Sequence, residues 1–249
     1  MTRTSKATKI VALVMTLTMI FGVFSIKGAT VASAATDRVS LYSATVTFAK
    51  YGYADYEVYV KTNDNASDQK VYVHYYYGAY NQGWVKTEAE YFTTLSDGSK
   101  IWKASIGGFQ CEYAIEYVAD GQTFWDNNNG QNYAGGQRIA SAPIELKRLG
   151  YQRYIQGEYR VEAMLQNYAY EKNVFVRYTT DGWNTYSDVA LRYSDTNADG
   201  TENWIASFPV GDLGDGTGFE YAVCYEVNGT QYWANNFGAN YDASYCAHQ

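Results

Sequence analysis

Residues 124–133 read Phe-Trp-Asp-Asn-Asn-Asn-Gly-Gln-Asn-Tyr, and residues 232–241, 108 positions later, read Tyr-Trp-Ala-Asn-Asn-Phe-Gly-Ala-Asn-Tyr. Each copy combines a flat aromatic ring, several side-chain amides and a glycine that permits a tight turn. Neither copy contains a histidine, a cysteine or a pair of carboxylates. This pattern predicts a surface that holds a polar ligand with one hydrophobic face, such as a sugar ring. It does not suit the breaking of bonds.

The repeat extends well beyond this stretch. Residues 56–77 align without gaps on 159–180, and residues 111–133 align without gaps on 219–241. The aligned runs alternate apolar and polar residues, as strands with one buried face do. The sequence therefore predicts an all-β chain built from two similar halves.

Turn residues separate the predicted strands. The Asp-Gly pair at 120–121 and the Asn-Gly pair at 228–229 predict hairpin turns, because both pairs tolerate a positive φ. Short strands separated by such turns, at about 100 residues per copy, are typical of β-sandwiches. We predict two tandem β-sandwiches, at residues 36–140 and 141–249. A short hinge of small residues is predicted between them, at 135–143.

Residues 1–35 have the features of a signal peptide: a basic start, an apolar run and small residues at a cleavage point. The apolar run Ile10–Phe24 is short for a membrane span, and an uncleaved anchor is the alternative. We therefore predict a secreted, extracellular protein with no membrane partner after processing. The net charge is −7, and loss of the leader's four basic residues would make it −11. An acidic chain repels phosphate groups, which argues against nucleic acid and anionic lipid as ligands.

The six tryptophans divide into three in each copy. Trp102 and Trp204 share a strand face with apolar residues, which predicts a place in the core. The remaining four either follow glycine in predicted loops or open the asparagine-rich stretch, where no alternation demands burial. We predict that these four contact a ligand; they are Trp84, Trp125, Trp183 and Trp233.

Metal and thiol chemistry are only weakly indicated. Asp195–Gly200 begins like a calcium loop, but the twelfth position is Ala206 rather than an acid, so a plain turn is favoured. No metal and no cofactor are predicted. Cys111 and Cys224 are predicted to be packed thiols, with a disulfide between Cys224 and Cys246 as the alternative.

Three blocks of the second copy resemble the family 21 carbohydrate-binding modules. They read Val-Arg-Tyr-Thr-Thr-Asp-Gly-Trp at 176–183, Phe-Glu-Tyr-Ala-Val-Cys-Tyr-Glu-Val-Asn-Gly at 219–229 and Trp-Ala-Asn-Asn-Phe-Gly-Ala-Asn-Tyr at 233–241. This family comprises starch- and glycogen-binding domains of some fungal glucoamylases and of glycogen-targeting phosphatase subunits. The resemblance covers nearly all of both copies. It implies immunoglobulin-like β-sandwiches that bind α-1,4-glucan (starch, glycogen or maltooligosaccharides) without catalysis.

The resemblance also implies particular site residues. In the family, sugar stacks on the loop tryptophan and on the aromatic residue that opens the asparagine-rich stretch, while asparagines bind its hydroxyls. The residues so implied are Trp84, Trp125, Asn127, Asn128, Asn132, Trp183, Trp233, Asn235, Asn236 and Asn240. The family's second site is implied in the second copy only, by Asn167, Tyr170 and Lys172. The corresponding residues of the first copy are Asp64, Ser67 and Gln69. Ala234 stands where the family usually has an acid, which Asp126 keeps.

Several other functions are weaker candidates. Glycoside hydrolysis needs two opposed carboxylates, and the pair Glu112 and Glu116 loses its second acid in the repeat, where Cys224 stands. Phosphatase docking is implied only by the family, and its motif ends in phenylalanine where residues 38–41 end in leucine. An exported chain would not meet the phosphatase in any case. A structural or adhesion pair without sugar binding is one alternative, and an accessory role beside a separate amylase is another.

Overall fold

The computed structural model describes residues 38–78, 83–109, 111–147, 153–213 and 218–245. All of these described residues belong to one compact unit. The predicted signal peptide and Cys246 lie outside the described residues. Within those ranges, no helix has the length and the apolar character needed to cross a bilayer.

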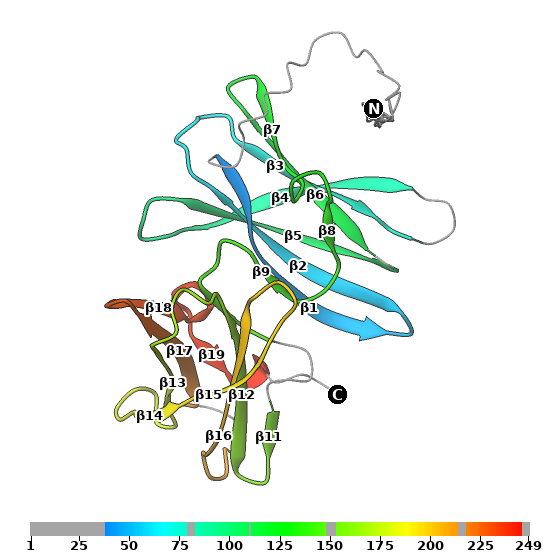
Figure 1. The fold of residues 1–249 in the computed structure, drawn as a ribbon. Coiled ribbons are helices and arrows are strands. Elements are labelled where there is room, and N and C mark those ends of the chain that lie inside the picture. The colour runs from blue at the N-terminus through cyan, green and yellow to red at the C-terminus, as the bar shows by residue number, and fades with distance from the viewer. Residues whose placement is uncertain (1–37, 79–82, 110, 148–152, 214–217, 246–249) are drawn as a thin grey trace, which may run out of the picture. The chain divides into compact units, whose positions relative to one another are not determined.

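The first half of the described chain consists of strands alone. They are β1 (Val39–Lys50), β2 (Tyr53–Thr62), β3 (Lys70–Tyr76), β4 (Trp84–Thr94), β5 (Lys100–Phe109), β6 (Glu112–Ala119), β7 (Gln122–Asp126), β8 (Tyr133–Ala134) and β9 (Arg138–Ile139). They form one sheet in the order β7-β6-β3-β4-β5-β2-β1-β9, with β8 also paired to β6. β4 connects two layers, because it pairs with β3 over residues 84–89 and with β5 over residues 90–94 (Figure 1).

The second half adds two short 3-10 helices to its strands. Its elements are β10 (Ile144–Leu146), β11 (Arg153–Ile155), β12 (Glu158–Leu165), β13 (Lys172–Thr179), β14 (Ser187–Ala190), β15 (Arg192–Thr196), β16 (Glu202–Pro209), β17 (Glu220–Val227), β18 (Thr230–Ala234), η1 (Asn236–Gly238), β19 (Tyr241–Asp242) and η2 (Ala243–Tyr245). One sheet has the order β10-β12-β16-β15, with β11 beside β12. The other has the order β14-β13-β17-β18, with β19 beside β17.

The two halves repeat the same strand order. The path β7-β6-β3-β4 corresponds to β18-β17-β13-β14, and the path β4-β5-β2-β1 corresponds to β15-β16-β12-β10. Leu191 interrupts the strand in the second half that is continuous as β4 in the first. The predicted hairpin turns are confirmed: the residues at 120–121 have φ values of 51° and 69°, and those at 228–229 have 52° and 76°. Each pair connects two hydrogen-bonded strands.

Each half has its own buried core. Alternate residues of β2 and β3, such as Val58 and Val73, are completely buried in the first half, and Val161 and Val176 are their counterparts in the second. Trp102 and Trp204 are only half-buried and pack against the margins of these cores. Their indole nitrogens donate hydrogen bonds to Thr62 Oγ1 and Glu202 Oε2, each at 2.9 Å. The predicted core role of these two tryptophans is thus confirmed in part.

The predicted hinge at 135–143 is wrong. Arg138 and Ile139 form β9, which pairs with β1. The backbone nitrogens of Ala140 and Ala142 donate to the carbonyl of Tyr42 at 3.0 and 3.1 Å. Small residues here allow close packing rather than motion, and Ala142 is fully buried. The connection between the halves is therefore hydrogen-bonded along its length.

Candidate functional site

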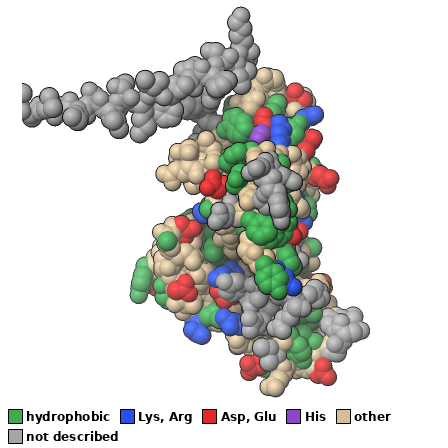
Figure 2. All heavy atoms as spheres, turned by 90° about the vertical axis from the view of Figure 1, so that its right-hand side faces the viewer, with side chains coloured by type: hydrophobic (Ala, Val, Ile, Leu, Met, Phe, Trp, Pro, Cys, Tyr) green, Lys and Arg blue, Asp and Glu red, His purple; other side chains and the backbone are tan. Residues whose placement is uncertain are grey.

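Exposed aromatic side chains are spread over the surface, and hydrophobic side chains lie in separate groups among polar ones on the face shown in Figure 2. Trp233 is one of them, on β18 and opposite Cys224 of β17, with 37% of its surface exposed. Its ring meets the ring of Phe175 edge-on, at 5.7 Å between centroids. The Arg177 guanidinium lies 5.6 Å from the ring centroid. Trp233 therefore lies on the outer face of the sheet, where Phe175 and Arg177 pack against its ring.

Trp183 lies in the loop after β13 and is held in an unfavourable backbone conformation. Its φ of 67° is rare for a bulky residue, and such strain often marks a functional site. The backbone N–H of Trp183 donates to Thr179 Oγ1 at 3.0 Å. Asp181 closes the loop by accepting from Thr185, and these bonds, led by the Thr185 backbone N–H, lower the pKa of Asp181. The indole nitrogen of Trp183 then donates to Glu220 Oε2 at 2.7 Å.

Glu220 connects the loop tryptophan to the asparagine-rich stretch. The side-chain amide of Asn240 donates to the same Glu220 Oε2 at 2.9 Å. Sequence reasoning did not assign a role to Glu220, although an acid, Glu112, stands at the aligned position of the first half. We call Trp183, Glu220, Trp233 and Asn240 the platform. Glu220 and Cys224 are four residues apart on one strand, so the two tryptophans stand about 13 Å apart along it.

The other asparagines of the second stretch shape the loop. Asn235 Oδ1 accepts from the backbone nitrogen of Gly238 at 3.1 Å, and Asn236 Nδ2 donates to the carbonyl of Asn240 at 3.1 Å. The first half repeats both bonds: Asn127 accepts from Gly130 at 2.9 Å, and Asn128 donates to the carbonyl of Asn132 at 2.8 Å. Asn132 and Asn240 both adopt positive φ, which asparagine tolerates.

The first half does not bring its two tryptophans together. Trp125 is 37% exposed and lies against His74, with ring centroids 4.9 Å apart. Trp84 is not in a loop as predicted: it begins β4, is 50% exposed and pairs with Tyr76. Trp125 lies three strands away and four residues further along the sheet. The separation is roughly 20 Å from the usual strand spacing and residue rise.

An ionic cluster lies beside Trp125 in the first half. Glu116 Oε2 contacts His74 Nε2 at 2.6 Å and Lys86 Nζ at 2.7 Å. Burial raises the pKa of Glu116, but hydrogen bonds from Lys86 and His74 outweigh that effect and lower the pKa below its usual value. His74 lies on β3, with its side chain 25% exposed.

The predicted second site is held differently from the expectation. The Lys172 side chain is only 2% exposed, and its ammonium donates to Asn167 Oδ1 at 2.6 Å and to Glu202 Oε2 at 2.8 Å. Tyr170, in contrast, is 93% exposed. In the first half the lysine stands on the other strand. Lys100, which aligns with Glu202, donates to Gln69, which aligns with Lys172, at 2.5 Å. Lys172 therefore has a structural role beside any contact with sugar.

We expect Lys172→Ala to lower the free energy of unfolding by about 3 kcal/mol, because it leaves the Glu202 carboxylate buried without its cation. Tyr170→Ala is the matched control and should change stability by less than about 0.5 kcal/mol, since that ring is exposed. Urea unfolding of both full-length variants measures the difference. Equal stability of the two variants would contradict a structural role for Lys172.

Asp126 faces inward. Its carboxylate accepts from the Leu41 backbone nitrogen at 2.7 Å and from the Tyr133 hydroxyl at 2.8 Å. In the second half Glu145 accepts from the equivalent groups, Leu146 at 3.2 Å and Tyr241 at 3.0 Å. The acid missing at position 234 has thus been replaced from a different strand.

The carboxylates of the calcium-like segment, residues 195–200, accept hydrogen bonds from nearby side chains. Asp195 Oδ1 accepts from Asn203 Nδ2 at 2.6 Å, and Asp199 Oδ1 accepts from Thr201 Oγ1 at 2.6 Å. The described residues contain no group of three or more potential metal ligands. Cys111 and Cys224 are free and buried, and burial raises the pKa of each thiol to about 11.

Residues 138–244 match the model of a family described as a carbohydrate/starch-binding module, family 21. One family 21 module is found in this chain. This agrees with the resemblance seen in the sequence for the second copy. The matched family is a non-catalytic binding module, which is consistent with the prediction that the protein is not an enzyme.

Known relatives share parts of their length with this chain. Glycogen-binding subunit 76A of Drosophila melanogaster is 36% identical over 88 residues, which cover 35% of this chain and 12% of the relative. Protein phosphatase 1 regulatory subunit 3B of Rattus norvegicus is 36% identical over 80 residues, or 31% of this chain and 28% of the relative. The chain thus spans under a third of either relative. Together with the family match, they support binding of glycogen or starch.

Two solved structures are similar to part of the chain. One is the carbohydrate-binding module of the muscle glycogen-targeting subunit of protein phosphatase 1, at 23% identity and a TM-score of 0.34, covering 40% of this chain and 73% of that one. The other is a circularly permuted family 21 module, at 27% identity and a TM-score of 0.27, covering 42% and 97%.

These relatives overturn the prediction of a secreted, extracellular protein. Glycogen-binding subunits and regulatory subunits of protein phosphatase 1 point to an intracellular protein instead. The argument that the chain cannot meet a phosphatase because it is exported falls with that prediction.

Proposed function

We propose that this protein binds α-1,4-glucan without catalysis, and that the platform of the second half is its principal site. The family match over residues 138–244 carries the proposal. The geometry supports it, because Trp183 and Trp233 offer two rings on one sheet face, with Glu220 and Asn240 as polar groups. A pyranose can stack its C–H face on such rings while its hydroxyls bind the amide and the carboxylate.

The platform is arranged before ligand arrives. Trp183 is fixed by hydrogen bonds at both its backbone and its indole nitrogen. Asn240 is fixed by the loop bonds of Asn235 and Asn236 and by its own bond to Glu220. Fixing these groups in advance lowers the ordering entropy that binding would otherwise cost. The curved track of amylose fits two separated rings better than flat cellulose does.

We also propose that the chain holds two modules of the same family. Residues 141–249 form the module that the family model matches, and residues 36–140 form the other. The repeated strand order and the repeated asparagine bonds support this assignment. The wide separation of Trp84 and Trp125 implies a weaker site in the first module. Asn127, Asn128 and Asn132 would hold the loop beside Trp125, and Tyr170 with Asn167 would give a further contact on the second module.

Adsorption to insoluble starch, with cellulose in parallel, tests the proposal. The full-length protein should be retained on starch and should pass through cellulose, and it should release no reducing sugar from soluble starch. Equal retention on both polymers, or on neither, would refute α-glucan binding. Release of reducing sugar would refute the non-catalytic role.

A phosphatase partner has less support in this chain than an α-glucan ligand has. Val39 and Leu41, the apolar residues of the segment compared with the docking motif, are 1% and 0% exposed in the core of β1. The segment is therefore not available to another protein while the first half is folded. A separate amylase as partner rests only on the resemblance.

A further inference from the structure

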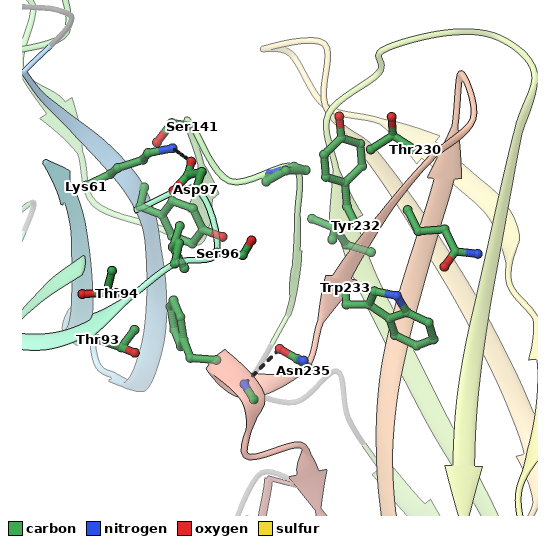
Figure 3. A pocket seen from close by; sticks show the side chains of 17 residues that line it. Lys61, Thr93, Thr94, Ser96, Asp97, Ser141, Thr230, Tyr232, Trp233 and Asn235 are labelled. Carbon is green, nitrogen blue, oxygen red and sulfur yellow. Dashed lines mark hydrogen bonds and ion pairs between the residues drawn. The ribbon is translucent and has the colours of Figure 1, made fainter. Parts of the chain in front are cut away.

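A cleft of about 690 Å³ lies within the compact unit, between strands of the first half and the edge strand β18 of the second. Figure 3 shows Lys61, Thr93, Thr94, Ser96, Asp97 and Ser141 on one side, with Thr230 and Tyr232 on the other. We propose that this cleft is an additional glucan subsite, built jointly by both halves, that accommodates a chain extending beyond the platform. This inference rests on the proposed function.

The lining has the chemistry of a site for uncharged sugar. Four threonine and serine side chains, Thr93, Thr94, Ser96 and Ser141, lie across the cleft from Tyr232. The two charged residues in the lining, Lys61 and Asp97, neutralise each other at 2.8 Å. The volume is within the usual range for small-molecule sites. A cleft with hydroxyls, aromatic rings and a neutralised ion pair suits a neutral polyol better than an ionic ligand.

The cleft is continuous with the platform across β18. Trp233 and Asn235 belong to its lining, but the Trp233 ring turns to the opposite side of β18 from Tyr232 and Thr230 (Figure 3). Asn235 lies at the end of the strand, between the two surfaces. β18 lies at the end of its sheet, and among the described strands its pairing partner is β17, so its second edge offers backbone N–H and C=O groups to a ligand. A glucan chain that leaves Trp233 and crosses this edge enters the cleft.

Phe237 indicates that the cleft has a fixed shape. This residue adopts φ of 54° and ψ of 34°, a left-handed conformation that is strained for a bulky side chain. Its ring packs against Tyr59 and Phe92 of the first half, each at 5.1 Å between centroids. The aligned residue of the first half is Asn129, which tolerates a positive φ of 57° without such packing. The contacts across the halves therefore hold the asparagine-rich loop at one end of the cleft.

The test is a Ser96→Trp substitution in the full-length protein, which fills the cleft from an exposed turn. Ala198→Trp is the matched control, because residue 198 occupies the same place in an identical turn of the second half and does not line the cleft. Both turns have the same closing bond, Gly98 to Leu95 and Gly200 to Asn197, at 2.9 Å. Isothermal titration with maltotriose and with maltoheptaose measures affinity, and melting temperature reports the fold.

We expect Ser96→Trp to weaken maltoheptaose binding about tenfold while maltotriose affinity stays within about twofold, since only the longer chain reaches the cleft. Ala198→Trp should leave both affinities unchanged. Unchanged maltoheptaose affinity in Ser96→Trp would overturn the subsite, while the proposed function would stand. If the native protein binds neither sugar, the proposed function itself fails. Should Ser96→Trp melt early, Ser96→Arg gives the same comparison with a flexible side chain.

Discussion

Trp233→Ala is expected to lower the affinity of the full-length protein for maltoheptaose by about 5- to 150-fold. The estimate follows from aromatic stacking worth about 1–3 kcal/mol per ring, taking a sugar to stack as a nucleobase does. Truncation also leaves the Phe175 ring and the Arg177 guanidinium without the surface that they contact. Titration calorimetry with maltoheptaose measures the loss.

Trp125→Ala is the matched comparison for this prediction. Both tryptophans are 37% exposed on equivalent strands, so their removal should affect stability similarly. The loss of affinity should be smaller for Trp125→Ala, because Trp84 is too far away to complete a platform in the first half. A fall in melting temperature that fully accounts for lost binding in Trp233→Ala would place that ring in the structure rather than in the site. Equal loss of affinity in both variants would contradict the proposed inequality of the halves.

The sequence predicts well those features that depend on neighbours along the chain. The hairpin turns and the alternating strands depend on local residue types, and both are confirmed. The strand order of one half predicts that of the other only when the repeat is recognised. The exact spacing of the site is harder to predict, because four extra residues in the first copy move Trp84 from a loop to the start of β4.

Features that depend on contacts between distant strands could not be predicted from the sequence. The family resemblance implies a sugar site at Lys172, but the partner of this lysine, Glu202, lies 30 residues away and is identified only when the strands are paired. Glu220 belongs to the platform because Trp183, which precedes it in the chain, and Asn240, which follows it, both donate to its carboxylate. Small residues at 135–143 resemble a flexible linker, and only the pairing of Arg138 and Ile139 with β1 shows otherwise.

The relocated acid leads to a large expected change in stability. Glu145→Ala should lower the free energy of unfolding of the full-length protein by about 3 kcal/mol, because buried donors lose their acceptor. Three groups donate to this carboxylate: the hydroxyl of Tyr241, the backbone nitrogen of Leu146 and, from the first half, the hydroxyl of Ser43 at 3.4 Å. Asp126→Ala should have a similar effect, since the same two kinds of donor surround it. Urea unfolding at constant pH measures both.

The pH dependence separates the charge of Glu145 from its hydrogen bonds. Burial raises the pKa of Glu145, so the folded state binds a proton more tightly than the unfolded state does. Its contribution is therefore most favourable below the usual pKa of a glutamate and is lost as the pH rises through the folded pKa. Glu145→Gln cannot lose a proton, and the stability of the native protein relative to this variant should fall as the pH rises from 4 to 8. A constant difference over that range would contradict ionisation at this site.

Moving the acid within the first half tests whether its position can be exchanged. Ser40 aligns with Glu145, and both residues immediately precede the leucine whose backbone nitrogen the carboxylate binds. Ser40→Glu in the Asp126→Ala background should therefore recover part of the lost stability, on the order of 1 kcal/mol, by restoring an acceptor for Tyr133 and Leu41. Ser40→Gln in the same background is the control for side-chain bulk without charge. If neither double variant is more stable than Asp126→Ala alone, the two carboxylates are not equivalent, and the similarity of their contacts has no energetic meaning.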